Sequence, residues 1–460
     1  MIRQNLARRF IAAWSNFKRA NAGNVATTFA LATIPIVGFV GSAVDYSRAN
    51  STKAAMQAAI DATALMLSKN ASSMTAAQIT TKANDYFKAL FTRPEAKNIV
   101  ITASYTTTGG SQVVLNGSAT VPTNFMGLMG YSNMPISVTS TAKWGMNKLR
   151  VALALDNTGS MSDDGKMSAL KTATRNLLTQ LQSAAAKDGD VYVSIIPFAK
   201  DVNIGSGTFN QSYIDWTDFD ENNGSCSTSP RWGSYNTKSD CVNGGGRWSA
   251  TNHNRWNGCV TDRGGSNSPD SNNWDQKVDA PTTTAASKFP AEQYDACPVA
   301  IQGLTYNWTT LNNLVDDMQP SGGTNQPVGL VWAWQSLVGG GPLTAPAKDP
   351  NFIYSDVIIL MSDGLNTQDR WYGNGSTTST SVDKRMYDST KSGIGTCANA
   401  KAAGVTIYTI HVNTGGDPTS TLLQNCASSS DKFTEIKTAN QLISTFQSIG
   451  TALSKLRIAN

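Results

Sequence analysis

The feature that most constrains this chain is an uncharged stretch close to its start. No Asp, Glu, Lys or Arg occurs from Ala20 to Val44. A helix of that length, at ~1.5 Å rise per residue, can cross a hydrocarbon layer of ~30 Å. We therefore expect one transmembrane helix over residues 24–44, preceded by a short segment over residues 1–23.

The excess positive charge of the chain is confined to the segment before this helix. Residues 1–44 contain no acid, and removing their basic residues from the net charge of +5 leaves a neutral body. Those basic residues are Arg3, Arg8, Arg9, Lys18 and Arg19. Positive residues beside a membrane helix stay in the cytoplasm, so we expect a cytoplasmic N-terminus and an exported body. A neutral body lacks a basic face for phosphates, which argues against nucleic-acid partners.

Two kinds of cleavage compete with retention of this helix as an anchor. Gly41-Ser42-Ala43 has the small residues of a signal-peptidase site, although the preceding basic region is long for a signal peptide. A pilin-type cut after Gly23 would want Glu five residues later, where this chain has Thr28. The sequence favours retention.

Beyond the membrane stretch, residues 45–147 are expected to form a helical stalk and a small β-module. Neither Gly nor Pro occurs between Ser42 and Arg93, so the helix should continue as an Ala-rich stalk that breaks near residues 70–73. A second helix, 75–90, should end before Pro94. Strand patterns follow at residues 98–105, 112–121 and 136–144, with a turn at Gly109-Gly110.

Several short motifs in this part of the chain recur together in one known family. They are Gly23-Asn24, Phe29-Ala30-Leu31, Pro35, Gly41, Val44-Asp45, QAAIDATAL from Gln57 and VPTNFMGLMG from Val121. In this order they resemble the N-terminal segment of TadE/TadG-like proteins of Flp (tight adherence, Tad) pilus assembly. The resemblance covers residues 1–145 and implies a membrane-anchored component whose partners are other pilus-assembly proteins.

From residue 148 the pattern changes to alternating strands and helices. The run LRVALALD ends in Asp156, a helix is expected over residues 166–183, and further strand patterns occupy 191–198, 356–361 and 405–412. This alternation predicts an α/β fold with a doubly wound sheet over residues 148–456. Ligands of such sheets collect at the carboxyl ends of the strands, where Asp156 and Asp363 fall.

Three loops of this predicted domain carry oxygen-bearing side chains. The first follows Asp156 and places Thr158 and Ser160 at alternate positions, so one tight turn can direct three oxygens at a single point. The second, SGGTNQ, supplies Thr324, and its glycines Gly322 and Gly323 allow close backbone approach. The third is Ser362-Asp363-Gly364. Hard cations such as Mg²⁺ prefer oxygen ligands of this kind.

The order of these loops resembles the metal-ion-dependent adhesion site (MIDAS) of von Willebrand factor type A domains, in which DxSxS, a distant Thr and a distant Asp share one Mg²⁺. The resemblance implies that Asp156, Thr158, Ser160, Thr324 and Asp363 bind Mg²⁺, with Mn²⁺ or Ca²⁺ as alternatives. Thr158 stands where Ser is commoner and keeps the hydroxyl. The implied mechanism is adhesion in which a partner's carboxylate completes the coordination of the ion. The alternative is that each Asp only caps a helix.

An insertion over residues 201–300 interrupts the predicted domain with a region rich in Gly, Asn, Ser and Asp. Because it leaves the carboxyl end of a strand, it should emerge beside the metal loops, where it could flank or partly cap them. The alternative is a surface excursion held by disulfides, and the two roles are compatible. In an exported body an even number of cysteines predicts disulfides. The candidates are Cys226, Cys241, Cys259, Cys297, Cys397 and Cys426, and six cysteines allow 15 connectivities, which the sequence leaves open. If the insertion is a structural excursion, Cys226 would pair with Cys241 and Cys259 with Cys297. Cys397 opens one expected helix and Cys426 ends another, so we expect these two to pair.

Catalytic motifs are scarce in this sequence. The two histidines, His253 and His411, are too far apart for HExxH, and neither GxSxG nor a phosphate-binding GxxxxGK[ST] occurs. The favoured function is therefore non-enzymatic: Tad pilus assembly or adhesion at a bacterial inner membrane, with the body periplasmic or surface-exposed. The alternatives are an adhesion receptor unrelated to pili, a chelatase-like or enzymatic subunit, and a minor pilin.

Overall fold

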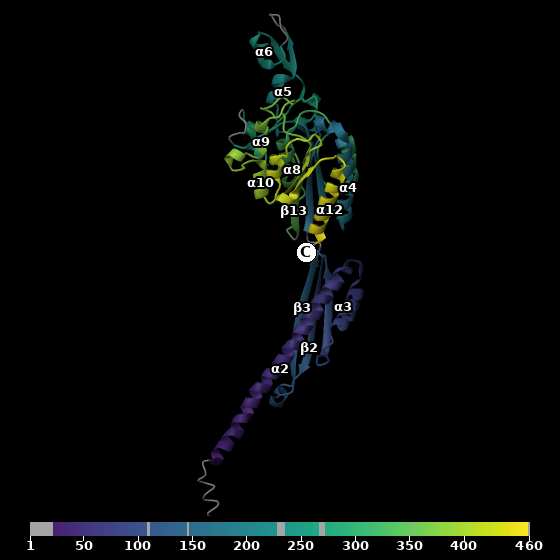
Figure 1. Cartoon of the computed structure of the whole chain (residues 1–460), viewed down its shortest axis with the longest axis vertical. Coiled ribbons are helices and arrows are strands. Elements are labelled where there is room, and N and C mark those ends of the chain that lie inside the picture. Colours follow the sequence, from purple (N-terminus) through teal and green to yellow (C-terminus); the bar gives the residue numbers. More distant parts are fainter. Residues whose placement is uncertain are drawn as a thin grey trace, which may run out of the picture. The chain divides into compact units, whose positions relative to one another are not determined.

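The computed structural model describes residues 22–107, 111–144, 147–227, 235–265, 272–350 and 352–458. The chain divides into two compact units, Met1–Trp144 and Gly145–Asn460. Each unit is described by itself (Figure 1). The five basic residues of the predicted N-terminal segment and the expected turn at residues 109–110 lie outside the described residues.

The first unit is built on one long helix, α2 (Ala22–Ser68), which runs without interruption through Pro35. Its large apolar side chains between residues 29 and 40 are exposed, whereas Met56, Ile60 and Leu67 are buried against the rest of the unit. Among the described residues, α2 is the one helix long and apolar enough to cross a membrane. The predicted continuation of the helix into a stalk is confirmed, and the break falls where expected, before η1 (Ala71–Ser73).

A second helix and a three-stranded sheet complete this unit. Helix α3 (Ala76–Leu90) begins with a capping box in which Thr75 and Gln78 satisfy each other's backbone N–H groups. Strands β1 (Lys97–Thr106), β2 (Ser111–Pro122) and β3 (Asn133–Trp144) form an antiparallel sheet in the order β1-β2-β3. Helix α2 lies close to β2 because Gly117 faces Met56, where an added Cβ would lie 2.9 Å from the methionine methyl group.

The second unit contains a sheet whose central strands are parallel, in the order β5-β4-β13-β14-β15. These strands are β4 (Asn147–Asp156), β5 (Val191–Phe198), β13 (Ile353–Ser362), β14 (Thr406–Val412) and β15 (Phe433–Ile436). Leu155 pairs with Met361, and Asp156 with Phe198, so β4, β5 and β13 end at the same edge. The predicted α/β arrangement is confirmed for these strands, and it extends to β15, which we did not predict.

Helices cover both faces of this sheet, and side chains alternate along β4 between them. Leu149, Val151, Leu153 and Leu155 share one core with helices α4 (Lys166–Ala184), α7 (Trp308–Asp317) and α12 (Gln441–Ile458). Ala152 and Ala154 belong to a second core with α8 (Gln326–Val338), α10 (Thr396–Ala402) and α11 (Thr421–Cys426). Residues buried on both faces explain the unbroken apolar run of β4.

The insertion folds into short helices and strands. Its short elements include β6 (Val202–Asn203), β7 (Ile214–Asp215), α5 (Thr217–Asn222), β8 (Gly224–Ser227), α6 (Lys238–Asn243), β9 (Arg247–Ala250), β10 (Cys259–Val260) and β11 (Phe289–Pro290). Strands β6 and β10, with β12 (Gln302–Thr305), add antiparallel pairs at the β5 edge of the sheet. The sheet is therefore mixed, because short returning segments pair with the edge strand of the parallel core.

All six cysteines are paired in the structure. The pairs are Cys226–Cys241, Cys259–Cys297 and Cys397–Cys426. Two of these pairs hold the insertion, while the third joins α10 to the end of α11. The last pair links the two helices at a Cα–Cα distance of 5.1 Å.

Candidate functional site

The site begins with the loop that follows β4. Asp156 is fully buried at the end of the strand, and its Oδ1 accepts hydrogen bonds from the backbone N–H of Thr158 at 2.9 Å and from Thr158 Oγ1 at 2.5 Å. Thr158 Oγ1 lies 3.1 Å from Ser160 Oγ. The tight turn therefore links a carboxylate and two hydroxyls in one chain of hydrogen bonds.

The loop that follows β13 meets this first loop. Ser160 Oγ donates to Asp363 Oδ1 at 2.7 Å, although the two residues are 203 positions apart. Ser362 Oγ donates to the other oxygen of Asp156 at 2.6 Å. Adjacent parallel strands bring these loops together. The side chains of Asp156 and Asp363 each form hydrogen bonds to residues of the other loop. Among the described hydrogen bonds, neither side chain caps a helix. The N-cap residue of the following helix, α4, is Gly165.

The second loop packs on the first through its backbone. Gly159 N–H donates to the Gly322 carbonyl at 3.0 Å, and Ser321 N–H donates to the Asn157 carbonyl at 2.8 Å. Gly322 has φ 84, and a Cβ there would lie 2.3 Å from the Tyr294 hydroxyl oxygen, so a larger residue would not fit. This packing fixes the segment that carries Thr324.

Thr324 itself is held by the segment after the third loop. Its N–H donates to Thr367 Oγ1 at 2.8 Å, and its carbonyl accepts from the N–H of Thr367 at 2.9 Å. The side chain is nearly buried. The backbone of the second loop is thus tied to both other loops, while the direct chain of side-chain bonds joins Asp156, Thr158, Ser160 and Asp363.

One residue of this site was missed by the sequence reasoning. Lys166, the first residue of α4, places its Nζ 2.5 Å from Asp363 Oδ2, and both side chains are almost completely buried. The sequence places a lysine at the start of the helix that follows the first loop, but its partner could not be identified without the structure.

The charges of the site are unevenly balanced. The carboxylates of Asp156 and Asp363 are both buried. Among the described ion pairs, one ammonium group, that of Lys166, lies at this site, and it pairs with Asp363. Burial, reinforced by the nearby Asp363 carboxylate, raises the pKa of Asp156 to about 7, even though hydrogen bonds from Ser362 and Thr158 act in the opposite direction. A bound cation would relieve this repulsion and favour the ionised carboxylate.

The donor set fits a hard divalent cation. Two carboxylates and the hydroxyls of Thr158 and Ser160 already contact one another, and oxygen donors of this kind suit Mg²⁺, Mn²⁺ and Ca²⁺. Within the described residues no cluster of three or more His, Cys, Asp or Glu side chains could hold a metal. The bonded set of Asp156, Thr158, Ser160 and Asp363 differs from such clusters, because two of its four side chains are neutral hydroxyls.

The insertion contacts the second loop and is joined by ion pairs to the segment that follows the third loop. The Tyr294 hydroxyl accepts a hydrogen bond from Gly323 N–H at 3.0 Å. Fully buried Arg385 pairs with Asp262 at 2.6 Å, Asp275 at 3.0 Å and Asp369 at 2.9 Å. Asp262 and Asp275 belong to the insertion, whereas Asp369 follows the third loop. The insertion therefore contacts the second loop directly and, through Arg385, the segment that follows the third loop.

The histidines lie outside this constellation. His411 is fully buried on β14, where its Nδ1 accepts from Ser420 N–H at 3.4 Å. His253 stacks on Trp216 at a centroid distance of 3.8 Å and bonds to Asp220 at 2.8 Å. Both contacts are those of structural histidines.

Comparison with known proteins gives one match at the level of sequence families. A model of Flp pilus-assembly TadE/G-like proteins matches residues 23–66, which lie within α2. The N-terminal part of the chain therefore carries a TadE/G-like pilus-assembly segment. No curated protein matches the chain.

Solved structures show more distant likenesses. The pilus adhesin SpaC from Lactobacillus rhamnosus GG is 12% identical, with a TM-score of 0.35, over 80% of this chain and 36% of that one. The vWF domain of the type V pili tip protein Mfa5 from Porphyromonas gingivalis is also 12% identical, with a TM-score of 0.35, over 68% of this chain and 97% of that one. Proximal thread matrix protein 1 from the mussel byssus, in a structure with a zinc-occupied MIDAS motif, is 11% identical, with a TM-score of 0.32, over 67% of this chain and 48% of that one. This chain thus spans about a third of SpaC and half of the mussel protein, and at these scores the likenesses establish no common function.

Proposed function

We propose that this chain is a membrane-anchored, non-enzymatic component of Tad/Flp pilus assembly that binds a partner protein through a divalent cation. The observation that carries the proposal is the bonded chain Asp156–Thr158–Ser160–Asp363, which joins two distant loops at the carboxyl edge of the sheet. The TadE/G-like match of residues 23–66 supports the connection to pili.

The proposed chemistry follows from the types of ligand. The bound ion, Mg²⁺ in the first instance and Mn²⁺ or Ca²⁺ as alternatives, would be held by Asp156, Thr158, Ser160 and Asp363, with Thr324 contributing from the second loop. When bound, the ion supplies an open coordination position for a carboxylate of the partner. Hydroxyl ligands neutralise no charge, which keeps the ion attractive to an external acid. We also assign the second unit to the von Willebrand A-type domains, because Asp156, Thr158, Ser160, Thr324 and Asp363 follow the pattern of their adhesion site.

The proposed location follows from α2 and the charge distribution. Helix α2 would cross a bacterial inner membrane once over residues 24–44, with the basic N-terminus in the cytoplasm. The cysteine pairs agree with a body in the oxidising periplasm or at the surface.

Calorimetric titration of Mg²⁺ and Mn²⁺ into the full-length protein in detergent tests the metal site. We expect saturable binding that is lost in Asp156→Ala and in Asp363→Ala. Asp163→Asn is the matched control, because this exposed acid lies in the same region but makes no bond to the site. Binding that survives in both alanine variants, or its absence from the folded wild-type protein, would contradict the proposal.

A pull-down with the pilus-assembly proteins of the same cell tests the partner class. Capture should require the divalent ion and fail with EDTA and with Asp363→Ala. Capture that is equal with and without the ion would point to a different binding surface.

A further inference from the structure

An apolar segment, residues 123–132, connects β2 and β3 and is unusually exposed for its composition. It contains no charged residue, and a short helical turn, η2 (Met126–Met129), lies at its centre. Four of its large side chains are partly or largely exposed: Phe125 at 39%, Leu128 at 85%, Met129 at 52% and Tyr131 at 65%. We call this segment the apolar loop. Soluble surfaces rarely gather such side chains without a partner.

The apolar loop is fixed to α2 by one carboxylate. Asp45 Oδ1 accepts from the N–H of Asn124 at 3.0 Å, and Oδ2 accepts from the N–H groups of Phe125 and Met126 at 2.8 and 2.7 Å. Asp45 is only 3% exposed. The first acid after the uncharged stretch therefore holds this loop, and both of its carboxylate oxygens accept hydrogen bonds from the loop backbone.

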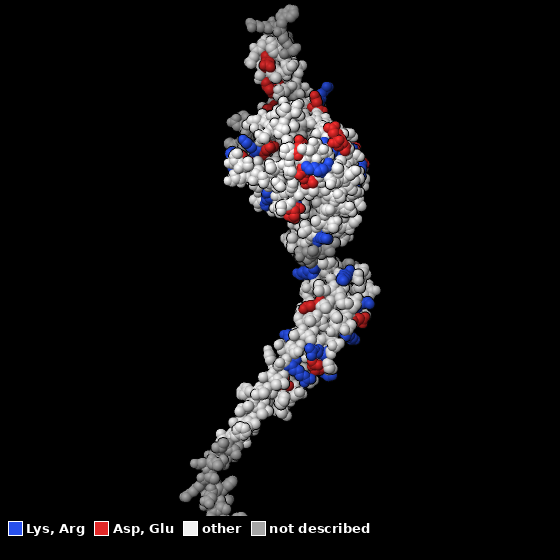
Figure 2. Space-filling view, in the orientation of Figure 1, with Lys and Arg blue, Asp and Glu red and all other residues white. Residues whose placement is uncertain are grey.

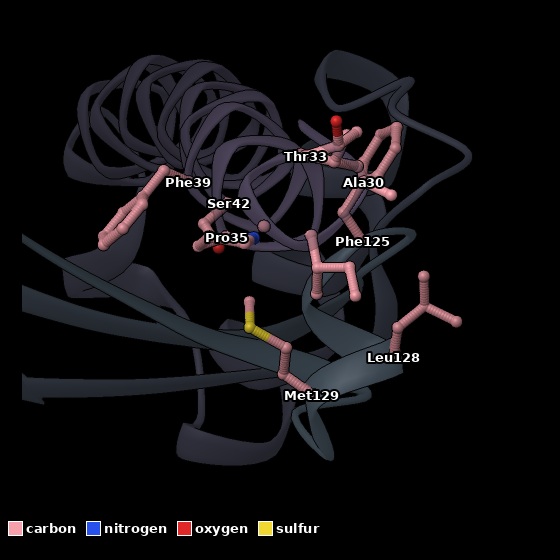
Figure 3. A pocket seen from close by; sticks show the side chains of 11 residues that line it. Ala30, Thr33, Pro35, Phe39, Ser42, Phe125, Leu128 and Met129 are labelled. Atoms are coloured by element: carbon pink, nitrogen blue, oxygen red, sulfur yellow. The ribbon is translucent and has the colours of Figure 1, made fainter. Parts of the chain in front are cut away.

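The loop also packs against the helix on the N-terminal side of Asp45. A Cβ at Gly41 would lie 2.4 Å from the Phe125 side chain, and one at Gly38 would lie 3.7 Å from Met129 Sδ. Beside this contact runs a groove of about 680 Å³, lined by residues of α2 together with Phe125, Leu128 and Met129. Figure 3 shows Phe125, Leu128 and Met129 from the loop and Pro35 and Phe39 from the helix around this space.

The position of the apolar loop along α2 determines whether the loop lies in the membrane or in water. A hydrocarbon layer of ~30 Å requires about 20 residues of helix, so the whole stretch from Asn24 to Val44 is needed to cross it. Gly38 precedes Asp45 by seven residues, or ~10 Å along the helix. Whatever packs on Gly38 and Gly41 therefore lies inside the membrane once the helix spans it. Figure 2 shows this stretch of α2 without acidic or basic side chains.

We infer that the apolar loop is a second membrane-inserted element, which enters the non-cytoplasmic leaflet beside α2 and whose groove is filled by lipid acyl chains. This inference rests on the proposed membrane span. Continuity with the exposed apolar surface of α2 argues for lipid as the occupant, because exposed apolar side chains of the helix and the side chains of Leu128 and Met129 line one groove. A depth of ~10 Å is typical of apolar side chains in interfacial elements. The loop would set the depth and tilt of the helix as it leaves the membrane.

A fluorescent probe attached to Leu128→Cys tests the inference. All six native cysteines are in disulfides, so an introduced thiol is labelled selectively with the environment-sensitive dye NBD. The labelled full-length protein is placed in vesicles of phosphatidylethanolamine and phosphatidylglycerol, with and without doxyl-labelled lipid. Leu128 is largely exposed, so its replacement should not disturb folding.

Two further variants make each outcome decisive. Thr106→Cys lies at the other end of the sheet and should report water, while Phe39→Cys reports whether α2 itself is in the bilayer. We expect blue-shifted emission and strong doxyl quenching at positions 128 and 39, and neither at 106.

Quenching at 39 without quenching at 128 would overturn the inference and leave the proposed anchor intact. A blue shift at 128 that doxyl lipid does not affect would also overturn it, because the groove would then hold a protein helix or a second copy. Absence of quenching at both 39 and 128 would overturn the anchor and the inference together.

Discussion

Replacing Lys166 by Met should expose the competition between an internal ammonium group and a bound cation. Lys166 Nζ lies 2.5 Å from Asp363 Oδ2, with side-chain exposures of 8% and 0%. A divalent ion that uses this carboxylate must compete with the lysine for it. Met has a similar length and no charge, so the substitution removes the competitor without opening a large cavity.

The magnitude follows from the burial of the pair. Removing one partner of a buried ion pair costs ~3–5 kcal/mol, because the other charge is left uncompensated. Protonation of the remaining carboxylate reduces this cost, so we expect the metal-free variant to be less stable by about 3 kcal/mol. If about half of that energy opposes the metal in the wild-type protein, Mg²⁺ should bind the variant about tenfold more tightly, since 1.4 kcal/mol is a factor of ten.

Chemical denaturation with and without Mg²⁺ measures both effects. Stabilisation by a ligand grows with the logarithm of its concentration over Kd, so Mg²⁺ should stabilise Lys166→Met more than wild type and recover part of the loss. Lys171→Met is the matched control, because Lys171 lies on the same helix and donates instead to the Asp316 carbonyl. Equal stability of the metal-free variant and wild type, or equal stabilisation by Mg²⁺ in both, would refute the reasoning.

Two other substitutions test separate parts of this unit. Thr158→Ser should retain Mg²⁺ binding and Thr158→Val should lose it, because the hydroxyl bonded to Asp156 at 2.5 Å is the proposed ligand. Equal affinities of the two variants for Mg²⁺, measured by calorimetry, would exclude that role. Burial lowers the pKa of His411 below its usual value of ~6.5, so the folded protein binds fewer protons there than the unfolded chain. The resulting stability is present above pH ~6.5 and is lost as the pH falls through the folded pKa, so urea unfolding from pH 8 to pH 5 should show a loss that His411→Gln reduces.

The sequence indicated much of the local structure because local patterns carry it. The unbroken helix through Ala54 and Leu65 follows from the absence of Gly and Pro, and the strand ending in Asp156 follows from an apolar run closed by a polar turn. The hydroxyls of Thr158 and Ser160 stand at alternate positions of the first loop, and in the structure they are in contact. The short elements of the insertion could not be predicted in this way, because its two- to four-residue strands are too short to show a period.

Tertiary structure alone decided which of these parts meet. Ser160 reaches Asp363 because β4 and β13 are neighbours in the sheet, and strand order is not written in the periodicity of either strand. Lys166 enters the site for the same reason, since its partner is 197 positions away. In the sequence, Asp45 is only an acid that follows an apolar stretch. In the fold, its carboxylate accepts hydrogen bonds from the N–H groups of residues 124–126. The sequence determined the chemistry available at each position, whereas long-range packing determined which carboxylates, hydroxyls and ammonium groups share one site.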